Sequence, residues 1–422
     1  MQEHGYYPDF SRLKTNRRFF LKILAISNLY PPGFLGGYEL GCSDVMNGLM
    51  SRGHDITVLT STFGYGQAPP EKNVIRKLEH FWSTYPEGNL NLTYFQSLRA
   101  KWFSLKNYRL VTEIINKTKP DIVYHWGLDR ISPLSVLLAV NKKKIPGLIH
   151  LMDDWLYMTK IQNIKKSGFP LNRVKDFCKF RLDSFLEKFP LIVMSQTLCE
   201  DYVSHGFLKN KMYLLHPALP YSGGKLRQPA KSKQVFKLLY VGQLGDWKGV
   251  HIALQAMILL KKHENDVVYK LDLIGEGALD YVRMLQQLAA KNLVAQDIRF
   301  LGKKHREEIF HLMPDYDGLI FPTLRKEPFG FVIIEAMLAG LPVIASAQGG
   351  PVEIIEDKKN GLLFEPGNSI ELAEKIEYLG RNKDMRSRIR QTAYEIAKEK
   401  YNFEHYIDRI ENILEETLSR GL

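Results

Sequence analysis

Short runs of apolar residues alternate along the chain with longer segments in which apolar residues recur every three to four positions. The runs are typical of buried strands, and the longer segments are typical of helices packed on a sheet. Strands are predicted at 21–26, 55–59, 121–124, 147–151, 191–194, 212–215, 236–242, 271–274, 298–301, 318–321, 343–345 and 361–364. Helices are predicted at 38–51, 100–116, 133–140, 171–188, 196–205, 250–262, 331–339, 369–379, 385–399 and 401–419. This alternation indicates parallel sheets of the α/β class.

The order of these elements divides into two similar halves joined by a polar segment. Residues 222–233 contain Gly, Pro and Lys, as expected of an interdomain linker. We therefore predict a first domain over 1–221, a second over 234–400, and a final helical segment over 401–422. The irregular stretch 63–99, rich in Tyr, Pro and Asn, is predicted to be a long loop near the cleft between the domains.

The most informative stretch is the strand–loop–helix–strand unit between positions 318 and 345. Pro322 ends its first strand, and Gly340 supplies the left-handed conformation that ends its helix. Ligands bind beyond the carboxyl ends of parallel strands, so the loop that carries Glu327 is expected to face a site.

The start of this helix suits a ligand that has both phosphate and hydroxyl groups. The free N–H groups of Phe329, Gly330 and Phe331 can face an anion. Glu327 lies on the loop and Glu335 about one turn into the helix, and carboxylates accept hydrogen bonds well from paired hydroxyls. The arrangement favours a nucleotide sugar. The plain alternative is a pair of solvated glutamates, the second stabilised by the helix dipole.

The sequence from Glu327 to Ala345, followed by Gly349 to Glu353, resembles the donor-site signature of retaining family 4 glycosyltransferases, which have the GT-B fold. The resemblance implies two Rossmann-like doubly wound domains that face a central cleft. It also implies that the second domain binds the donor, that the first binds the acceptor, and that the final helix packs back on the first domain.

The same resemblance gives roles to the charged residues of the second domain. Glu335 is expected to accept hydrogen bonds from the ribose diol, Glu327 to bind sugar hydroxyls, and Lys248 to bind the departing diphosphate together with the helix amides. Gln243 stands where the family usually has an arginine. One cation and the amides are then expected to do the work of two cations.

Glycines and one lysine at other strand ends complete the predicted donor site. These positions are Gly36, Gly37, Gly275, Lys303, Gly349 and Gly350. By the resemblance, the first Gly-Gly loop approaches the donor phosphate and the acceptor, and the later glycines let backbone approach the nucleotide and the sugar. Lys303 lies where the family strand touches the base, and Glu353 is expected to orient its loop. A Gly-Gly turn alone often serves only to reverse the chain.

A predicted strand of the first domain ends at the position where many family members have His followed by Asp. Met152 takes the His position and Asp153 the Asp position. His150 lies about 7 Å deeper along the strand and is expected to be a core histidine. A retaining transfer can use the leaving phosphate oxygen to take the acceptor's proton, so loss of this His need not abolish catalysis. Asp153 is the predicted polar contact, in a catalytic group with Glu327 and Lys248.

Composition narrows the choice of partners. The 422 residues are 45% hydrophobic and carry a formal net charge of +12, which suits nucleic acid, an anionic membrane or an anionic substrate. The basic residues are dispersed and form no recognised nucleic-acid module, so a phosphorylated donor is the preferred explanation, with an anionic lipid surface as a second partner. Predicted helix 100–116 has a basic and aromatic face that can rest on a membrane, although core packing is favoured.

The sequence also sets expectations for location and cofactors. No run approaches the ~18 apolar residues of a membrane span, and residues 1–20 lack a signal-peptide core. We expect a cytoplasmic protein, at most peripheral at the inner face of the membrane. The three widely spaced cysteines form neither a disulfide framework nor a metal pattern. No cofactor and no metal are expected, because the cationic and amide clamp replaces a metal.

The predicted activity is transfer of a hexosyl group from a UDP- or GDP-sugar to a glycan, lipid-linked or small-molecule hydroxyl, with retention of anomeric configuration. Three alternatives remain. One is a nucleotide-sugar epimerase or a phosphorylase of the same fold. The second is a catalytically weak nucleotide-sugar-binding subunit, which Met152 and Gln243 encourage. The third is a basic nucleic-acid binder, which salt-dependent oligonucleotide binding would reveal.

Overall fold

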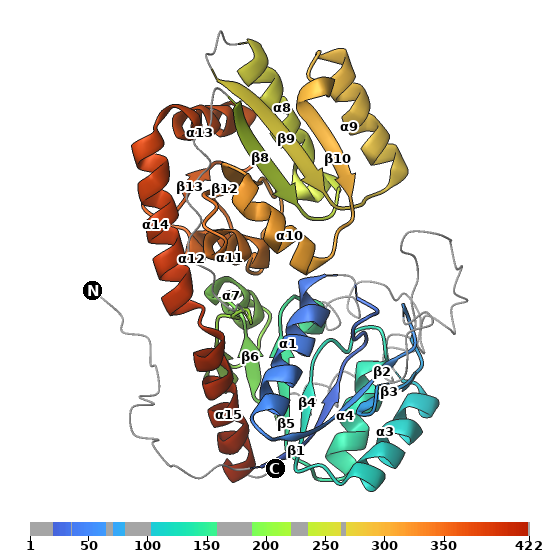
Figure 1. The fold of residues 1–422 in the computed structure, drawn as a ribbon. Coiled ribbons are helices and arrows are strands. Elements are labelled where there is room, and N and C mark those ends of the chain that lie inside the picture. Colours follow the sequence, from blue (N-terminus) through green and yellow to red (C-terminus); the bar gives the residue numbers. More distant parts are fainter. Residues whose placement is uncertain are drawn as a thin grey trace.

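The fold contains two parallel sheets, each covered by helices (Figure 1). The computed structural model describes residues 20–34, 36–64, 71–80, 103–157, 188–220, 235–262 and 267–420. Two long helices, α14 (Lys383–Lys400) and α15 (Phe403–Arg420), run along one side of both sheets. None of the helices in these described ranges is long and apolar enough to cross a bilayer.

The first sheet, over the described residues, has seven strands in the order β3-β2-β1-β4-β5-β6-β7. The strands are β1 (Lys22–Ile26), β2 (Asp55–Ser61), β3 (Val74–Leu78), β4 (Ile122–His125), β5 (Gly147–Leu151), β6 (Leu191–Val193) and β7 (Met212–Leu214). The helices are α1 (Gly37–Ser51), α3 (Leu105–Thr118), α4 (Pro133–Lys142) and α7 (Gln196–Ser204). The chain moves outward from β1 to β3 and then returns to place β4 on the other side of β1. Such a switch point is where α/β domains bind ligands.

The second sheet repeats this design with six strands in the described part of the chain, in the order β10-β9-β8-β11-β12-β13. The strands are β8 (Val235–Val241), β9 (Val268–Ile274), β10 (Ile298–Gly302), β11 (Gly318–Phe321), β12 (Val343–Ser346) and β13 (Leu362–Phe364). The helices are α8 (Val250–Lys262), α9 (Leu279–Lys291), α10 (Arg306–Leu312), α11 (Phe331–Leu338), α12 (Pro351–Ile354) and α13 (Ser369–Arg381). Its switch point lies between β8 and β11.

Burial explains why the central strands read as continuous apolar runs. Every residue of β4, β11 and β12 is buried, because helices cover both faces of a parallel sheet. Removing one such Leu or Ile side chain from water contributes about 1.5–3 kcal/mol. The strand and helix runs of the central sheets were therefore the most predictable part of the fold.

The predicted loop 63–99 is wrong over part of its length, because Val74–Leu78 forms edge strand β3. An edge strand is only half covered, and the charges of Arg76 and Lys77 interrupt the apolar run that would have indicated it. Predicted helix 100–116 is observed as α3, which begins later because the Ser104 side chain accepts a hydrogen bond from Asn107 N–H (3.2 Å). Helices α9 and α10 were not predicted at all.

Some predictions fall largely outside the described residues. These are helix 171–188 and the linker 222–233, and with the linker the limits 1–221 and 234–400 of the two domains. The domain limits therefore stay predictions.

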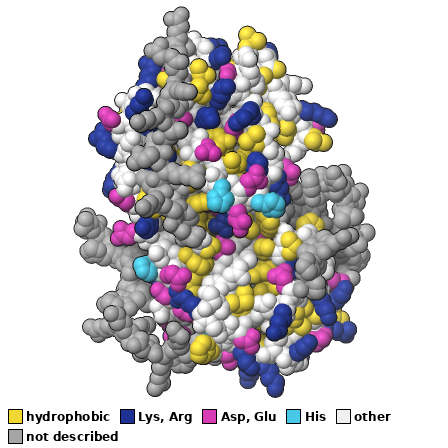
Figure 2. Space-filling model, in the orientation of Figure 1, with side chains coloured by type: hydrophobic (Ala, Val, Ile, Leu, Met, Phe, Trp, Pro, Cys, Tyr) yellow, Lys and Arg dark blue, Asp and Glu magenta, His cyan; other side chains and the backbone are white. Residues whose placement is uncertain are grey.

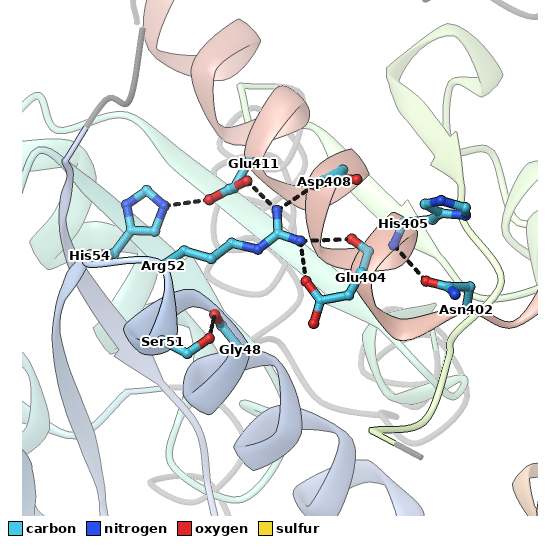
Figure 3. A network of polar contacts seen from close by, with 9 residues as sticks. All are labelled: Gly48, Ser51, Arg52, His54, Asn402, Glu404, His405, Asp408 and Glu411. Carbon is cyan, nitrogen blue, oxygen red and sulfur yellow. Dashed lines mark hydrogen bonds and ion pairs between the residues drawn. The ribbon is translucent and has the colours of Figure 1, made fainter. Parts of the chain in front are cut away.

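Helix α15 lies against the first domain, next to α1 and β5. Tyr406 of α15 reaches His150 of β5, where its hydroxyl lies 3.4 Å from Nε2. Asn402 accepts a hydrogen bond from His405 N–H (3.1 Å) and so caps the start of the helix (Figure 3). The final helix thus forms part of the core of the first domain.

A charged network at the end of α1 fastens α15 in place (Figure 3). Arg52 contacts three carboxylates of α15, with distances of 2.7 Å to Glu404, 2.5 Å to Asp408 and 2.6 Å to Glu411. Beside it, His54 Nε2 lies 2.9 Å from the second oxygen of Glu411. One guanidinium therefore bridges three acidic side chains and reduces the repulsion among them.

We expect Arg52→Ala to lower the free energy of unfolding by about 2 kcal/mol, because it removes several charge-assisted hydrogen bonds and leaves Glu411 partly buried without its cation. Urea unfolding at low ionic strength measures the loss. Arg388→Ala, on the exposed surface of α14, is the matched control and should change the unfolding free energy little. Equal unfolding curves for wild type and Arg52→Ala would contradict this role.

Candidate functional site

Five loops of the second domain meet at the carboxyl edge of its sheet. They follow β8, β9, β10, β11 and β12 and carry the predicted site residues Gln243, Lys248, Gly275, Lys303, Glu327, Gly349 and Gly350. The strands are parallel, so one edge of the sheet collects all five loops. The edge lies against the first domain: a Cβ atom on Gly37 would be 3.0 Å from the ring of Phe331.

Lys248 and Glu327 are in direct contact. The Lys248 ammonium and Glu327 Oε1 form an ion pair, and the two side chains are 23% and 17% exposed. Thr323 Oγ1 donates a weaker hydrogen bond to the same carboxylate oxygen (3.3 Å). The cation predicted for the diphosphate and the carboxylate predicted for the sugar thus lie at one point. Thr323 was missed in the sequence because a lone threonine after a strand has no distinctive pattern.

The position of Lys248 is fixed by backbone contacts between two loops. Lys248 ends a short 3-10 turn, and Gly249 follows it with a φ of +67°. A Cβ atom on Gly249 would lie 1.9 Å from the Pro322 carbonyl oxygen, so no other residue fits there. Leu324 N–H donates to the Trp247 carbonyl (2.8 Å) and joins the loops again. These contacts hold the lysine beside the glutamate loop.

The Gly349–Gly350 pair supports the same loop from the other side. Gly350 N–H donates to the Glu327 carbonyl (2.7 Å), and a Cβ atom on Gly349 would lie 2.4 Å from that oxygen. The close approach seen in the structure is therefore to the Glu327 loop, and approach to a sugar stays a prediction. Gly275 is similar, because a Cβ atom there would lie 1.8 Å from the Gly242 carbonyl oxygen.

Helix α11 begins where the sequence predicts, at Phe331, with Gly330 before it at a φ of +118°. Gly340, at a φ of +70°, follows its end as predicted. The Phe329 ring is buried and stacks on His216 with ring centroids 5.6 Å apart, so only its backbone can take part in binding a donor. The amides at the start of α11 remain the predicted phosphate contacts.

Glu335 lies one turn into α11 and is paired with a residue that the sequence analysis missed. Its Oε1 accepts a hydrogen bond from Arg306 Nε (2.8 Å), while Arg306 Nη1 donates to Asp44 Oδ2 (2.6 Å) on α1. Burial raises the pKa of Glu335, and the charge of Arg306 opposes this effect. A basic residue soon after the end of a strand at this edge was the available signal for Arg306.

The two remaining donor-side predictions lie on the same edge. The Gln243 carbonyl accepts a hydrogen bond from the Tyr240 hydroxyl (2.6 Å), so the backbone where the family usually has an arginine is held in place. Lys303 Nζ lies 5.3 Å from the ring centroid of Phe34, a residue of the first domain. Lys303 therefore spans the interface between the domains.

Asp153 lies on the first domain, just after β5. Its Oδ1 accepts a hydrogen bond from Trp155 N–H (3.2 Å), and its carbonyl accepts one from the Tyr202 hydroxyl (3.1 Å). Burial raises the pKa of Asp153 well above its ordinary value, and the nearby Asp129 carboxylate adds to the effect. A carboxyl group with a raised pKa is suited to hydrogen bonding or proton exchange with a hydroxyl.

Two residues near Asp153, His150 and Met152, are both buried but have different surroundings. His150 is fully buried, with Nδ1 2.8 Å from the Tyr124 hydroxyl and its ring stacked on Trp126 at 4.2 Å, and burial lowers its pKa to about 3. The prediction of a core histidine is confirmed. Met152 packs against Gly41 of α1, where a Cβ atom would lie 3.0 Å from its Cε. The position where the family usually has a histidine is therefore occupied by an apolar side chain.

The first Gly-Gly pair, Gly36 and Gly37, lies at the start of α1. Gly36 N–H donates to Glu39 Oε2 (3.1 Å), which forms a capping arrangement at the start of the helix. No described atom lies within 4 Å of a Cβ atom built on Gly36. Because the Gly36 N–H is already paired with Glu39, its approach to a donor phosphate or an acceptor stays a prediction.

Glu353 orients more than its own loop, because it caps a helix of the other domain. Its two carboxylate oxygens accept hydrogen bonds from Thr197 N–H (2.7 Å) and Gln196 N–H (2.8 Å) at the start of α7. His216 Nε2 lies 3.3 Å from the same carboxylate. Burial alone would raise the pKa of Glu353, but these hydrogen bonds outweigh it and lower the pKa to about 2.

We expect Glu353→Gln to lower the free energy of unfolding by about 1–2 kcal/mol at pH 7, since it loses a charged helix cap. Because the folded pKa lies below the ordinary 4.5, the ionised cap stabilises fully above about pH 5. Its contribution then declines as pH falls toward 2. Unfolding measured from pH 7 to pH 2 should show the two proteins converging in acid, and a constant difference would contradict the assignment.

Comparison with known proteins adds a family and a fold. Residues 225–396 match the family model Glycosyl transferases group 1. An uncharacterized glycosyltransferase of Methanocaldococcus jannaschii is 33% identical over 406 residues, covering 94% of this chain and 98% of that protein. Anabaena HepE in complex with UDP-glucose is similar in structure, with a TM-score of 0.69 at 21% identity over 94% of this chain and 100% of that one. For sucrose-phosphate synthase of Thermosynechococcus elongatus the TM-score is 0.71 at 19% identity, over 95% and 100%.

These structural likenesses confirm the predicted GT-B fold of two Rossmann-like domains.

The surface is consistent with the dispersed charge of the sequence: Figure 2 shows lysine and arginine side chains spread over both domains on this face, with acidic side chains between them. A duplex binder would be expected to gather its cations in one patch or stripe.

Proposed function

The chain belongs to the group 1 glycosyltransferases, and on that premise we propose that it transfers a hexosyl group from a UDP- or GDP-sugar to a hydroxyl acceptor, with retention of configuration. The observation that carries the proposal is the contact between Lys248 and Glu327 at the start of α11. An ion-paired cation and carboxylate on loops next to the start of a helix suit a sugar diphosphate.

The proposed reaction follows from the chemistry of these groups. Glu327 accepts hydrogen bonds from sugar hydroxyls, and Lys248 with the α11 amides stabilises the negative charge that develops as the bond from the anomeric carbon to the diphosphate oxygen breaks. That phosphate oxygen takes the proton of the acceptor hydroxyl, whose oxygen forms the new bond on the same face. No metal is needed for this step in our proposal, because the lysine and amides supply the positive charge.

Two further features support the division of roles between the domains. Asp153 lies just after β5 of the first domain with a carboxyl pKa raised by burial, and we assign it the contact with the acceptor hydroxyl. Gly36 has open space where a Cβ atom would lie, at the start of α1. Among similar folds, HepE has been solved with UDP-glucose. We propose a glycan or lipid-linked acceptor for this chain, with peripheral contact at an anionic membrane.

The melting temperature in the presence of UDP, GDP, ADP and their common sugar conjugates tests the donor. A ligand at ~100 times its dissociation constant adds about 2.7 kcal/mol to stability. We expect UDP or GDP, with one of its sugars, to raise the melting temperature clearly above the others. Absence of a shift with every nucleotide would contradict the proposal.

A catalytically weak nucleotide-sugar-binding subunit is the second candidate, favoured by Gln243 and Met152 in place of the family's usual Arg and His. Incubation with the identified donor and a mixture of glycan and lipid acceptors separates the two. Transferred sugar supports the enzyme, and tight binding without turnover supports the subunit. An epimerase would instead convert the donor sugar with no acceptor present.

A further inference from the structure

Arg306 joins carboxylates from the two domains at the predicted ribose contact. It is the first residue of α10, which lies beside the start of α1 across the interface (Figure 1). Nε donates to Glu335 of the second domain (2.8 Å), and Nη1 donates to Asp44 of the first (2.6 Å). One planar cation thus makes two divergent charge-assisted hydrogen bonds, a geometry that a lysine ammonium does not reproduce.

The bridge is shielded from solvent, so its charges interact strongly. The exposed fractions of the side chains are 27% for Arg306, 18% for Asp44 and 14% for Glu335. Ion pairs at such sites are screened less by salt than surface pairs. Removing the guanidinium would leave two half-buried carboxylates facing each other.

The segment 303–306 touches the first domain at a second point, where Lys303 lies over the Phe34 ring. The Glu353 cap on α7, also described above, involves different elements of both domains. The domains are therefore joined both at α7 and at α10. The α10 contact includes Glu335, the residue predicted to bind the ribose diol of the donor.

We propose that Arg306 is a positioning residue that orients Glu335 for the donor ribose and, through Asp44, links donor binding to the approach of the first domain. This inference rests on the proposed function, in which Glu335 binds the ribose diol. Arg306 occupies Oε1, and a carboxylate has acceptor capacity on both oxygens, so Oε2 can take the diol while the bridge stays intact. The donor then binds most tightly when the two domains are in contact.

A purely structural ion pair would behave differently. It would change the stability of the protein without changing its affinity for a nucleotide. If Asp44 is linked to the donor site, a substitution of Asp44 must change the affinity for the nucleotide. This change must also disappear when Glu335 is substituted.

Titration calorimetry on the full chain tests the inference, with whichever of UDP, GDP and ADP the wild-type protein binds most tightly. We expect Arg306→Gln to weaken binding about 10-fold or more and Asp44→Asn about 5-fold, the range usual for coupled sites. Asp44→Asn should have no further effect in a Glu335→Gln background. Glu308→Gln, an acid-to-amide change on the exposed side of α10, is the matched control and should bind as wild type.

The outcomes separate the inference from the function on which it rests. If the wild-type protein binds none of the three nucleotides, the proposed function and the inference both fail. If it binds one and the Arg306 and Asp44 variants bind equally well, the inference alone is overturned. Additive effects of Asp44→Asn and Glu335→Gln would also overturn it. If Arg306→Gln does not fold, Arg306→Lys replaces it in the test. This variant keeps the positive charge but loses the two-armed guanidinium, so it should still weaken nucleotide binding.

Discussion

Lys248→Ala is expected to lower turnover of the donor about 10²–10³-fold, the largest effect of any single change we consider. The sequence analysis assigns Lys248 to the diphosphate, and the structure places it in an ion pair with Glu327. Its positive charge matters more as the leaving group gains negative charge than when the donor is merely bound. The loss should therefore fall mainly on kcat and less on KM.

Steady-state kinetics with the identified donor measure this effect, and unfolding of the variant shows whether the loop is intact. Lys248→Arg keeps the charge and should recover part of the activity, although its planar head does not match the position of an ammonium. Thr323 still donates to Glu327 in both variants, so the loop retains one of its contacts. A folded Lys248→Ala protein with wild-type kcat would remove Lys248 from the reaction.

Glu335→Ala is expected to weaken nucleotide binding about 10–100-fold with little change in fold. A hydrogen-bonding site that loses a charged acceptor typically loses about 1.5–3 kcal/mol. The structure adds a detail to this prediction, because the freed Arg306 keeps its contact with Asp44 and the contact between the domains survives. The loss should therefore be in binding rather than in stability.

Calorimetric titration of the nucleotide and of its nucleoside monophosphate checks the second prediction. Both ligands carry the ribose, so both should lose affinity in Glu335→Ala, whereas a Lys248 variant should affect the diphosphate more. Glu374→Ala, on α13 away from the carboxyl edge of the sheet, is a suitable control. Unchanged affinity in a folded Glu335→Ala protein would exclude Glu335 from the site.

The fold could be predicted from the sequence where local pattern and burial agree. Strand 318–321 and helix 331–339 were recognised because helices on both faces make parallel strands continuously apolar and because Gly340 ends the helix. Edge strand β3 was missed because Arg76 and Lys77 interrupt its apolar run, and the sequence does not show that the Arg76 side chain is only 7% exposed and donates to the Tyr30 carbonyl (3.0 Å). A local sequence pattern does not show that β3 pairs with β2.

The candidate site could be predicted one residue at a time, but its pairings could not. Lys248 and Glu327 were each recognised, yet nothing in a separation of 79 positions indicates that they form an ion pair. Arg306 was overlooked because its partner Asp44 is 262 positions away in the other domain. Glu353 was expected to orient its own loop, and only the packed domains show that it caps α7.

The position of α15 has a consequence for how the protein folds during synthesis. Arg52 and Glu411 are 359 positions apart, and His150 and Tyr406 are 256 apart. Contacts between such distant segments form slowly, because a long loop must be closed before any contact energy is gained. The first domain leaves the ribosome with one face of α1 uncovered, and it stays so until residues 403–420 have been made. The first domain can therefore complete its core only after the second domain has been synthesised.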